Sequence, residues 1–492
     1  MRTRGFSTLE IMIAFAILAI VLAGVVMADF GSQYWTLTSQ TSNEALYKAK
    51  RYFEDLRASA KRDFLSATST PLTRDADTGC LAGSLCYYIQ NTVTDISPCS
   101  KYAQADVFWQ VRGYPTSTAS LFTTFADAHS VVTSGGDCSL NWPSGTWATM
   151  QSASSTALTA TPVAIDALNG AVYVVESGAP FLEVVKGGNK YSYTSPDNSV
   201  FNAIDVARNL VNGWTYAYVA VATTTNQLQI IDVTDPTSMF RAGEVTLSGV
   251  SSSGSYPAGW RLTFYDRKVY IATRDTSGPE FHVIDVGDPT NPFELGTGTE
   301  LTTSVYGIQV RDQIINGATR RFAYLATDAS ELQVYDVTKP DTVPPTLVAS
   351  CDLPGTQKAN SIALLGNRLY LGRDTISGSN DLYVFNATDP TASSFCTPLA
   401  AVDVDDDIYS RHVIGIRVSG PYLYVATTNS TNTHGEIQVR SIDPTTNLQI
   451  LGTRSVPTLI DNGIDFDSDA NQLYTLSGGT PTLESFTSIP TP

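Results

Sequence analysis

The chain has 492 residues, which exceeds what one hydrophobic core usually organises and therefore predicts two or more structural units. Hydrophobic residues make up 42% of it and charged residues 16%, and its many Thr, Ser, Gly, Tyr and Val residues favour β-structure over helical bundles. A formal net charge of −17 argues against a nucleic-acid-binding surface, because such a surface needs clustered Lys and Arg.

The N-terminal segment carries Arg2 and Arg4, followed by an uninterrupted apolar run over residues 11–28. A run of this length can cross most of a bilayer, and lipid requires a helix there because a helix pairs its own backbone amides. We therefore expect a membrane-spanning helix over about residues 9–28. Both arginines are expected to stay on the cytoplasmic side.

Glu10 lies at the edge of this apolar run, where a charge is costly unless it is paired. It follows the sequence GFSTL, which begins at Gly5 and Phe6. The segment closely resembles the class III leader of type IV prepilins, which a membrane peptidase cuts after glycine before it methylates the new N-terminal residue. The resemblance implies a leader over 1–5, cleavage between Gly5 and Phe6, and a pilin-like helix over 6–63.

The resemblance also implies a role for Glu10 in filament assembly. Its carboxylate would meet the N-terminal amine of a neighbouring subunit, and each charge would neutralise the other in hydrocarbon. Two alternatives remain open: a secretory signal peptide cut after Ala28, and a plain N-terminal anchor. Neither gives Glu10 a purpose.

Beyond the apolar run the pattern becomes that of an amphipathic helix, which we expect to continue to about Lys61. Apolar residues recur at three- and four-residue spacing, with charged residues between them. This stripe should pack on a small globular region, as pilins lay their helix against a sheet. The apolar positions are Leu46, Ala49, Phe53, Leu56 and Ala60.

Residues 64–147 are rich in Ser, Thr, Asp and Gly and contain four of the six cysteines, which suits a small cross-linked pilin head. The cysteines form no C-x-x-C pair, and their even number fits disulfides in an oxidising compartment; buried free thiols are the alternative. Proximity favours pairing of Cys351 with Cys396 and pairings among the first four. The disulfide candidates are Cys80, Cys86, Cys99, Cys138, Cys351 and Cys396.

A tyrosine-containing strand recurs seven times at intervals of 45 to 54 residues. Each follows an alternating apolar strand and precedes a third strand such as LQIIDV or LQVYDV. Four strands per interval are typical of propeller blades, which bury their faces only when stacked on neighbours. Seven blades are therefore expected over 148–492, with a strand at about Ala148–Leu158 closing the ring. The markers are Tyr173, Tyr218, Tyr270, Tyr324, Tyr370, Tyr424 and Tyr474.

Turns containing Asp-Pro form a second repeated signal, as in DVTDP at Asp232–Pro236 and DVGDP at Asp285–Pro289. Proline fixes its own backbone angle, and the carboxylate is expected to bond local amides. These strings resemble the LVIVD-type propeller repeat, from about Thr161 to the C-terminus. Because they recur in phase with the tyrosines, both signals predict the same blades.

Catalytic signals are weak. The chain contains no G-x-S-x-G elbow, no H-E-x-x-H helix and no phosphate-binding glycine loop, so we expect no enzyme. The four histidines are scattered without ligand spacing and are expected to have no special role. They are His129, His282, His412 and His434.

Two acidic stretches place carboxylates at alternating positions, which can present hard oxygen ligands to calcium. One covers 403–407, and the other resembles the opening of a calcium loop. The second lacks the glycine and the closing glutamate of an EF-hand, so polar hairpins between strands are the favoured interpretation. No other cofactor is expected. The candidate calcium ligands are Asp465, Asp467, Asp469 and Asn471.

Together these patterns predict a mainly β protein with a long N-terminal pilin-like α-helix, a small disulfide-linked α+β head and a seven-bladed β-propeller. The expected function is that of a minor or specialised type IV pilin, at the tip or another sparse position, displaying the propeller for adhesion or macromolecule binding. The expected partners are other pilin subunits, the prepilin peptidase, the inner-membrane assembly platform and a surface ligand. The chain is expected in the cytoplasmic membrane before assembly, with the propeller outside the cytoplasm.

Two other functions remain open. The first is a pseudopilin of a type II-like secretion system, in which the propeller engages cargo. The second is a membrane-tethered enzyme that uses the central opening of the propeller, because propeller active sites are assembled from distant loops.

Overall fold

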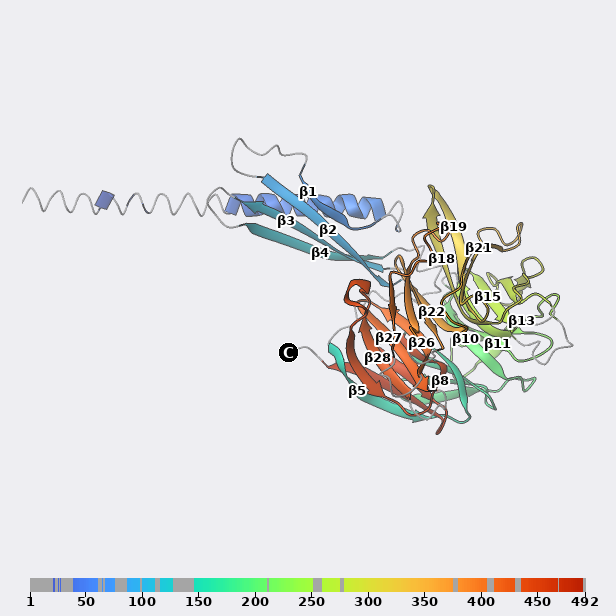
Figure 1. Ribbon diagram of the computed structural model, residues 1–492. Helices are drawn as coiled ribbons and strands as arrows, with labels where there is room; N and C mark the ends of the chain where they lie inside the picture. Colours follow the sequence, from blue (N-terminus) through green and yellow to red (C-terminus); the bar gives the residue numbers. More distant parts are fainter. Residues whose placement is uncertain are drawn as a thin grey trace, which may run out of the picture. The chain divides into compact units, whose positions relative to one another are not determined.

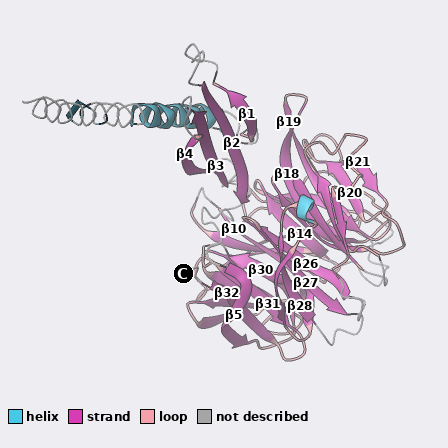
Figure 2. Cartoon of the chain, turned by 60° about the vertical axis from the view of Figure 1, so that its left-hand side comes forward, coloured by secondary structure: helices cyan, strands magenta, loops and turns pink. Residues whose placement is uncertain are grey.

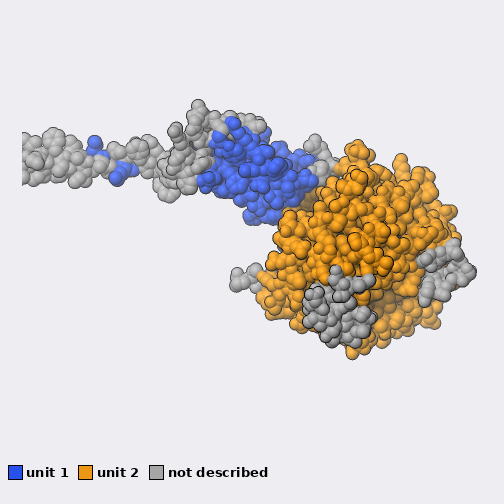
Figure 3. Space-filling view, in the orientation of Figure 1, with its two compact units in different colours: residues 1–93, 102–123 blue, residues 94–101, 124–492 orange. Residues whose placement is uncertain are grey.

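A computed structural model describes residues 21, 22, 25, 27, 39–60, 64, 67–75, 86–97, 100–110, 116–126, 146–209, 212–250, 259–274, 278–374, 379–404, 411–429, 435–467 and 469–489. The chain divides into two compact units, which Figure 3 colours separately. Unit 1 comprises residues 1–93 and 102–123, and unit 2 comprises residues 94–101 and 124–492.

Unit 1 places a helix over residues 39–60 against a four-stranded sheet (Figure 1). The strands follow the order β1-β2-β3-β4, with β1 and β2 antiparallel. Ala45 and Ala49 are fully buried in one cluster with sheet residues that include Tyr87, Val107 and Trp109. The strands are β1 (Thr70–Arg74), β2 (Cys86–Ser97), β3 (Ser100–Gln110) and β4 (Ser117–Ala126).

The helix 39–60 carries a charged residue on its buried side. The Lys48 Nζ lies 2.5 Å from Asp75 Oδ2 and 5.1 Å from the centre of the Tyr87 ring. Lys48 and Asp75 are both buried, so each charge replaces the water that the other has lost. Of the stripe expected from the sequence, Ala49 and Ala60 are buried but Leu46 is exposed; its place on the buried side is taken by Ala45, and the ion pair lies inside this contact.

The expectation of one long N-terminal pilin-like helix is wrong. The continuous described helix is confined to residues 39–60, and no helix among the described residues is both long enough and apolar enough to span a membrane. The physical reason is that Lys50, Arg51 and Asp55 interrupt its apolar positions, so this helix suits a sheet surface. Most of the segment expected to span the membrane, about 9–28, lies outside the described residues.

Among its described residues, unit 2 contains seven four-stranded sheets, each of which runs through its strands in order from the inner to the outer strand. The first four are β6 (Pro162–Leu168), β7 (Ala171–Glu176), β8 (Leu182–Lys186), β9 (Asn189–Tyr193); β10 (Phe201–Arg208), β11 (Thr215–Val221), β12 (Leu228–Asp232), β13 (Phe240–Val245); β14 (Gly259–Tyr265), β15 (Lys268–Thr273), β16 (Phe281–Asp285), β17 (Phe293–Glu294); and β18 (Val305–Ile315), β19 (Ala318–Thr327), β20 (Leu332–Asp336), β21 (Thr346–Cys351).

The remaining three sheets are β22 (Ala359–Leu365), β23 (Arg368–Arg373), β24 (Leu382–Asn386), β25 (Ala400–Val402); β26 (Arg411–Ser419), β27 (Tyr422–Asn429), β28 (Gly435–Ser441), β29 (Ile450–Ser455); and β30 (Leu459–Asp467), β31 (Gln472–Ser477), β32 (Thr482–Ile489), β5 (Thr146–Ala157). A short 3₁₀ helix, η1 (Pro444–Thr446), follows β28. Figure 2 shows how fully strands dominate this unit.

The seven sheets close into a ring. The inner strands are neighbours in the order β6, β10, β14, β18, β22, β26 and β30, and β30 contacts β6 again. The last sheet takes its outer strand from the start of the unit, because β5 pairs antiparallel with β32. The expected closing strand is therefore in place, and it joins the two ends of the repeat region by hydrogen bonds.

The marker tyrosines explain why the repeat is visible in the sequence. Each lies in the second strand of its sheet and is at least 93% buried in a cluster that also contains residues of the next sheet. The core of unit 2 is therefore a series of seven layers between sheets. Each layer contains one marker tyrosine, so the tyrosines recur in the sequence once per sheet.

The Asp-Pro turns use the expected chemistry. Asp235 Oδ1 accepts the backbone N–H of Thr237, and Asp288 and Asp389 do the same for the residue two positions on. The turn between β6 and β7 uses Asn169 and Gly170, with φ of 53° and 74°. Two successive residues in the left-handed region are typical of a tight hairpin whose twist matches the strands.

Candidate functional site

The seven inner strands surround a cavity of about 280 Å³. The residue that pairs with each marker tyrosine lines it, so one equivalent position from every sheet meets at the centre. Five of these seven residues are charged or have an amide, which makes the cavity polar. They are Asp166, Asp205, Thr263, Gln309, Ala363, Arg417 and Asp465.

Three consecutive sheets place an aspartate at this position, and each aspartate binds the next sheet. Asp465 Oδ2 accepts the backbone N–H of Ala167 at 2.7 Å, and Asp166 Oδ2 accepts that of Val206. Asp205 Oδ2 accepts the N–H of Phe264 at 2.8 Å and the hydroxyl of Thr263 at 3.1 Å. These carboxylates therefore join neighbouring inner strands as well as lining the cavity.

Arg417 supplies a cation at the same level of the cavity. Its Nε lies 2.6 Å from Asp465 Oδ1, so both oxygens of Asp465 are engaged. Burial raises the pKa of Asp205 to about 6, and the nearby charge of Asp465 adds to the effect, whereas the hydrogen bonds from Phe264 and Thr263 and the charge of Arg417 oppose it. Asp205 can consequently accept or donate a hydrogen bond near neutral pH.

The inner strands are irregular where they begin. The pairing register of β10, β14, β18 and β22 shifts at the second residue of each strand. A β-bulge of this kind redirects side chains locally. The residues at these bulges are Asn202, Trp260, Tyr306 and Asn360, and Asn202 and Tyr306 line the cavity.

Arg261 follows the bulge of β14 and lines the cavity. Its Nε donates to the Tyr306 carbonyl at 3.1 Å, and its Nη1 donates to the Trp260 carbonyl at 3.1 Å. With its amide turned to satisfy both groups, Asn462 accepts from Arg261 Nε and Nη2 at 3.3 and 3.2 Å. Burial lowers the pKa of Arg261 to about 10; Arg274 contributes to this shift, and Asp461 opposes it.

Aromatic rings hold three cations near the end of the cavity at which the bulged inner strands begin. The guanidinium carbons of Arg261 and Arg274 lie 4.3 and 3.6 Å from the centre of the Trp260 ring. The Lys358 Nζ lies 4.4 Å from the centre of the Tyr306 ring. Such contacts fix long cationic side chains by attraction to the ring face. We call Trp260, Arg261, Arg274, Tyr306 and Lys358 the cationic rim.

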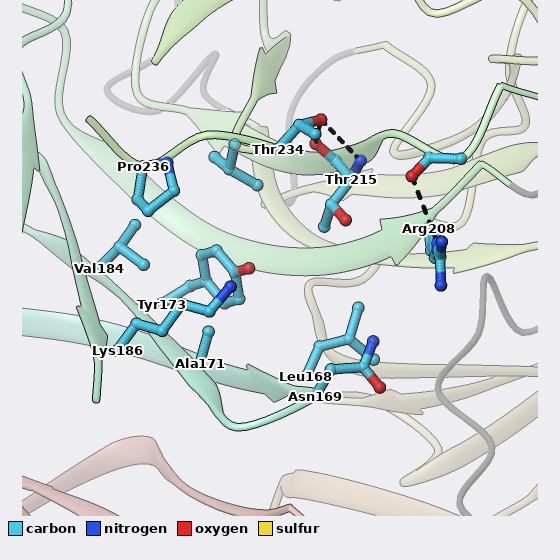
Figure 4. A pocket seen from close by; sticks show the side chains of 12 residues that line it. Leu168, Asn169, Ala171, Tyr173, Val184, Lys186, Arg208, Thr215, Thr234 and Pro236 are labelled. Atoms are coloured by element: carbon cyan, nitrogen blue, oxygen red, sulfur yellow. Dashed lines mark hydrogen bonds between the residues drawn. The ribbon is translucent and has the colours of Figure 1, made fainter. Parts of the chain in front are cut away.

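A second kind of hollow lies between sheets. One, of about 210 Å³, separates the β6–β9 sheet from the β10–β13 sheet, and Figure 4 shows Tyr173, Lys186, Arg208 and Thr234 around it. An equivalent hollow of about 600 Å³ follows two sheets later, where Arg321 binds Asp266 and Asp312 at 2.6 and 2.7 Å. Because these hollows recur between blades, they are features of the repeat. The central cavity is the one to which all seven inner strands contribute among the described residues.

The calcium candidates occupy the end of β30 and the turn after it. Asp467 accepts the backbone N–H groups of Gly170, Asp469 and Ala470, and Asp465 is engaged as described above. Asn471 has a φ of 50°, as expected of a hairpin turn. Within the described ranges, no three His, Cys, Asp or Glu side chains form a group that could hold a metal ion. Residues 405–407 of the other acidic stretch lie outside those ranges.

Three of the six cysteines lie in the described residues, and all three are disulfide-bonded. Cys351, at the end of β21, is bonded to Cys396, which precedes β25, so this disulfide joins neighbouring sheets. Cys86 is also bonded. The candidates Cys80, Cys99 and Cys138 lie outside the described residues, as do Gly5, Phe6 and Glu10.

The described histidines have structural surroundings. His282 is buried, with Nδ1 2.6 Å from Glu294 Oε1 and Nε2 2.9 Å from the Pro279 carbonyl oxygen. His412 Nδ1 lies 3.4 Å from Asp374, which also accepts from Asn360. His129 and His434 lie outside the described residues. Of the seven residues that pair with the marker tyrosines, sequence reasoning singled out Asp465 alone, although aligning the repeats on their tyrosines would have placed all seven at one position.

Comparison with known proteins identifies the repeat. The LVIVD repeat family matches residues 210–246 and 410–431, which fall in the second and sixth sheets of the ring. No curated protein sequence matches the chain.

Two solved structures resemble the chain at low similarity. A candidate 6-phosphogluconolactonase from Bacteroides uniformis is 13% identical with a TM-score of 0.41, covering 67% of this chain and 96% of its own. A protein of unknown function from Bacteroides thetaiotaomicron is 10% identical with a TM-score of 0.39, covering 85% and 98%. At this level of similarity neither supports an inference about activity. The chain thus carries LVIVD repeats within a β-propeller-like fold.

Proposed function

We propose that this protein is a type IV pilin-like subunit that displays its propeller-like unit outside the cytoplasm as a binding module. The observation that carries the proposal is the combination of two features in one chain. The sequence from Gly5 to Glu10 resembles a prepilin processing site, and unit 1 packs an amphipathic helix on a four-stranded sheet. Pilins also lay a helix against a sheet.

The disulfides support an extracytoplasmic location. All three described cysteines are bonded, and disulfides persist in oxidising compartments. The proposed partners in assembly are other pilin subunits, the prepilin peptidase and the inner-membrane assembly platform. Because a ring of seven sheets would crowd a filament built wholly of this subunit, we propose a minor or tip position.

Binding is a better proposal than catalysis for the cavity. Its three aspartates are engaged with backbone amides of neighbouring strands, and Asp465 is also paired with Arg417. Groups with these structural contacts are poorly placed to move during a reaction, but they present fixed oxygens to a ligand. The cavity thus favours a display module with a small polar site.

Replacement of Glu10 tests the assembly role. Glu10→Ala should produce stable protein that is lost from sheared filament fractions of the native host, because the carboxylate that would pair with a neighbouring N-terminal amine is gone. Glu54→Ala is the matched control, because Glu54 is an exposed acid of the helix 39–60 in unit 1. Equal recovery of Glu10→Ala and the control in filaments would contradict the proposal.

A further inference from the structure

Arg261 is a cation without a matching anion. Its hydrogen bonds run to the carbonyl oxygens of Tyr306, Trp260 and Asn202 and to the amide of Asn462, all of them neutral groups. Among the described residues no carboxylate lies within ion-pair distance of it, and Asp461 acts on it only through its field. A half-buried charge that neutral groups hold in place attracts an anion from outside.

The remainder of the cationic rim strengthens this attraction. Arg274 and Lys358, both partly buried, stand over the faces of Trp260 and Tyr306, and these contacts fix their positions. The nearby acid Asp374 is occupied by Asn360 and His412. The chain as a whole has a net charge of −17, so the three cations of the rim form a local positive site on an acidic protein.

The cavity beyond the rim has a different chemistry. Asp205, Thr263 and Gln309 present carboxylate, hydroxyl and amide groups, and the cavity of about 280 Å³ has room for a single small ring. Carboxylate oxygens at this depth repel a second negative charge on the ligand, but they accept hydrogen bonds from hydroxyl groups. The ligand should therefore carry one anionic group and several hydroxyls.

We propose that the cavity binds a sugar acid, the uronate unit of an acidic polysaccharide, with its carboxylate on Arg261 and its hydroxyls toward Asp205. The inference names the ligand of the binding module and so builds on the display role, but the site lies wholly in unit 2. A phosphate or sulfate ester would bring more negative charge toward Asp205 and Asp465, whose carboxylates would repel it. A nucleic acid would bring negative charge along its whole backbone.

The test is calorimetric titration of the purified full-length protein with glucuronate and galacturonate. At least one uronate should bind saturably, whereas glucose, which lacks the carboxylate, and acetate, which lacks the hydroxyls, should bind at least about tenfold more weakly. Equal binding of glucose would overturn the role of the cationic rim. Equal binding of acetate or inorganic phosphate would overturn the saccharide assignment.

Two variants locate the site. Arg261→Gln should weaken uronate binding by about tenfold or more, and Lys358→Gln, which removes a charge held, among the described residues, only over the Tyr306 ring, by about threefold. Arg454→Gln is the control with the same change in charge, because Arg454 lies on an outer strand against Phe486 and Ser152. If Arg261→Gln does not fold, Lys358→Gln decides the matter. Unchanged affinity in a folded rim variant would refute the assignment.

The titration is separate from the filament experiment. If the wild type binds uronate but Glu10→Ala still enters filaments, the ligand assignment stands and the pilin role is rejected. Normal loss of Glu10→Ala from filaments, with no uronate binding, would leave the pilin role and reject the ligand.

Discussion

Asp381 offers the sharpest test of how a single sheet of the ring is held together. It precedes β24, is fully buried, and its Oδ1 accepts the backbone N–H of Val404 at 2.8 Å after the outer strand of the same sheet. Its Oδ2 is buried without a hydrogen-bond partner among the described residues. Burial raises its pKa to about 7 from an ordinary 3.8, and Asp403 adds to the shift, whereas the Val404 amide and Arg440 oppose it.

The sign of the effect on stability follows from proton binding. Between about pH 4 and pH 7 the folded chain holds a proton on Asp381 that the unfolded chain has released, so the free energy of unfolding falls as pH rises through this window. At about 1.4 kcal/mol per pKa unit, the full loss is ~4 kcal/mol. Asp381→Asn should abolish this pH dependence, because an amide does not titrate in this range. Its amide oxygen can still accept the backbone N–H of Val404.

The equivalent residue of an earlier sheet supports this expectation. Gln227 precedes β12 and accepts the backbone N–H of Leu247 at 3.0 Å, so a neutral amide already serves at this position. Urea unfolding of the wild type and of Asp381→Asn at pH 5 and pH 8 measures the difference. The stability gained by the variant should be larger at pH 8 by about 3 kcal/mol.

Asp235→Asn serves as the control, because Asp235 is exposed and hydrogen bonds from Thr237 lower its pKa. This variant should gain nothing as pH rises. A stability difference for Asp381→Asn that is the same at pH 5 and pH 8 would refute the reasoning.

Two further predictions concern the layers between sheets. Tyr370→Phe should lower the free energy of unfolding by about 1 kcal/mol, because the Tyr370 hydroxyl donates to the Ile442 carbonyl at 3.0 Å. Tyr424→Phe should lower it little, because the buried Tyr424 hydroxyl has no partner among the described residues. Equal losses of the two variants in urea unfolding would contradict this prediction. The double variant Cys351→Ser/Cys396→Ser should lose roughly 4 kcal/mol of unfolding free energy, as expected when the cross-link that closes a loop of 45 residues is removed. The reduced wild type should show the same loss in urea unfolding. A loss below about 1 kcal/mol would show that the sheets are joined without the disulfide.

Much of unit 2 is predictable from the sequence because its signals repeat. The seven tyrosines, the Asp-Pro turns and the alternating strands each recur once per sheet, so an accidental match at one position does not affect the rest. The pairing of Cys351 with Cys396 follows from the same logic, since both fall near outer strands of adjacent sheets. Closure by β5 follows from the missing strand of the last repeat.

Other features depend on three-dimensional surroundings. The apolar run over 11–28 predicts a helix from local hydropathy alone, but the described helix 39–60 owes its place to packing of Ala45 and Ala49 on the sheet. The bulges at Trp260 and Tyr306 leave no periodic trace, because one extra residue looks like loop variation. Nor does the sequence reveal that Asp381 is buried, since polar residues before strands are common.

The most direct test of the proposed function is the mass and N-terminal sequence of the mature protein from its native host. The proposal predicts a chain that begins at Phe6 with a methylated amine, one that the prepilin peptidase has cut after Gly5. A chain beginning at Met1, or one cut after Ala28, would contradict it and leave a propeller-like binding protein without a role in a filament.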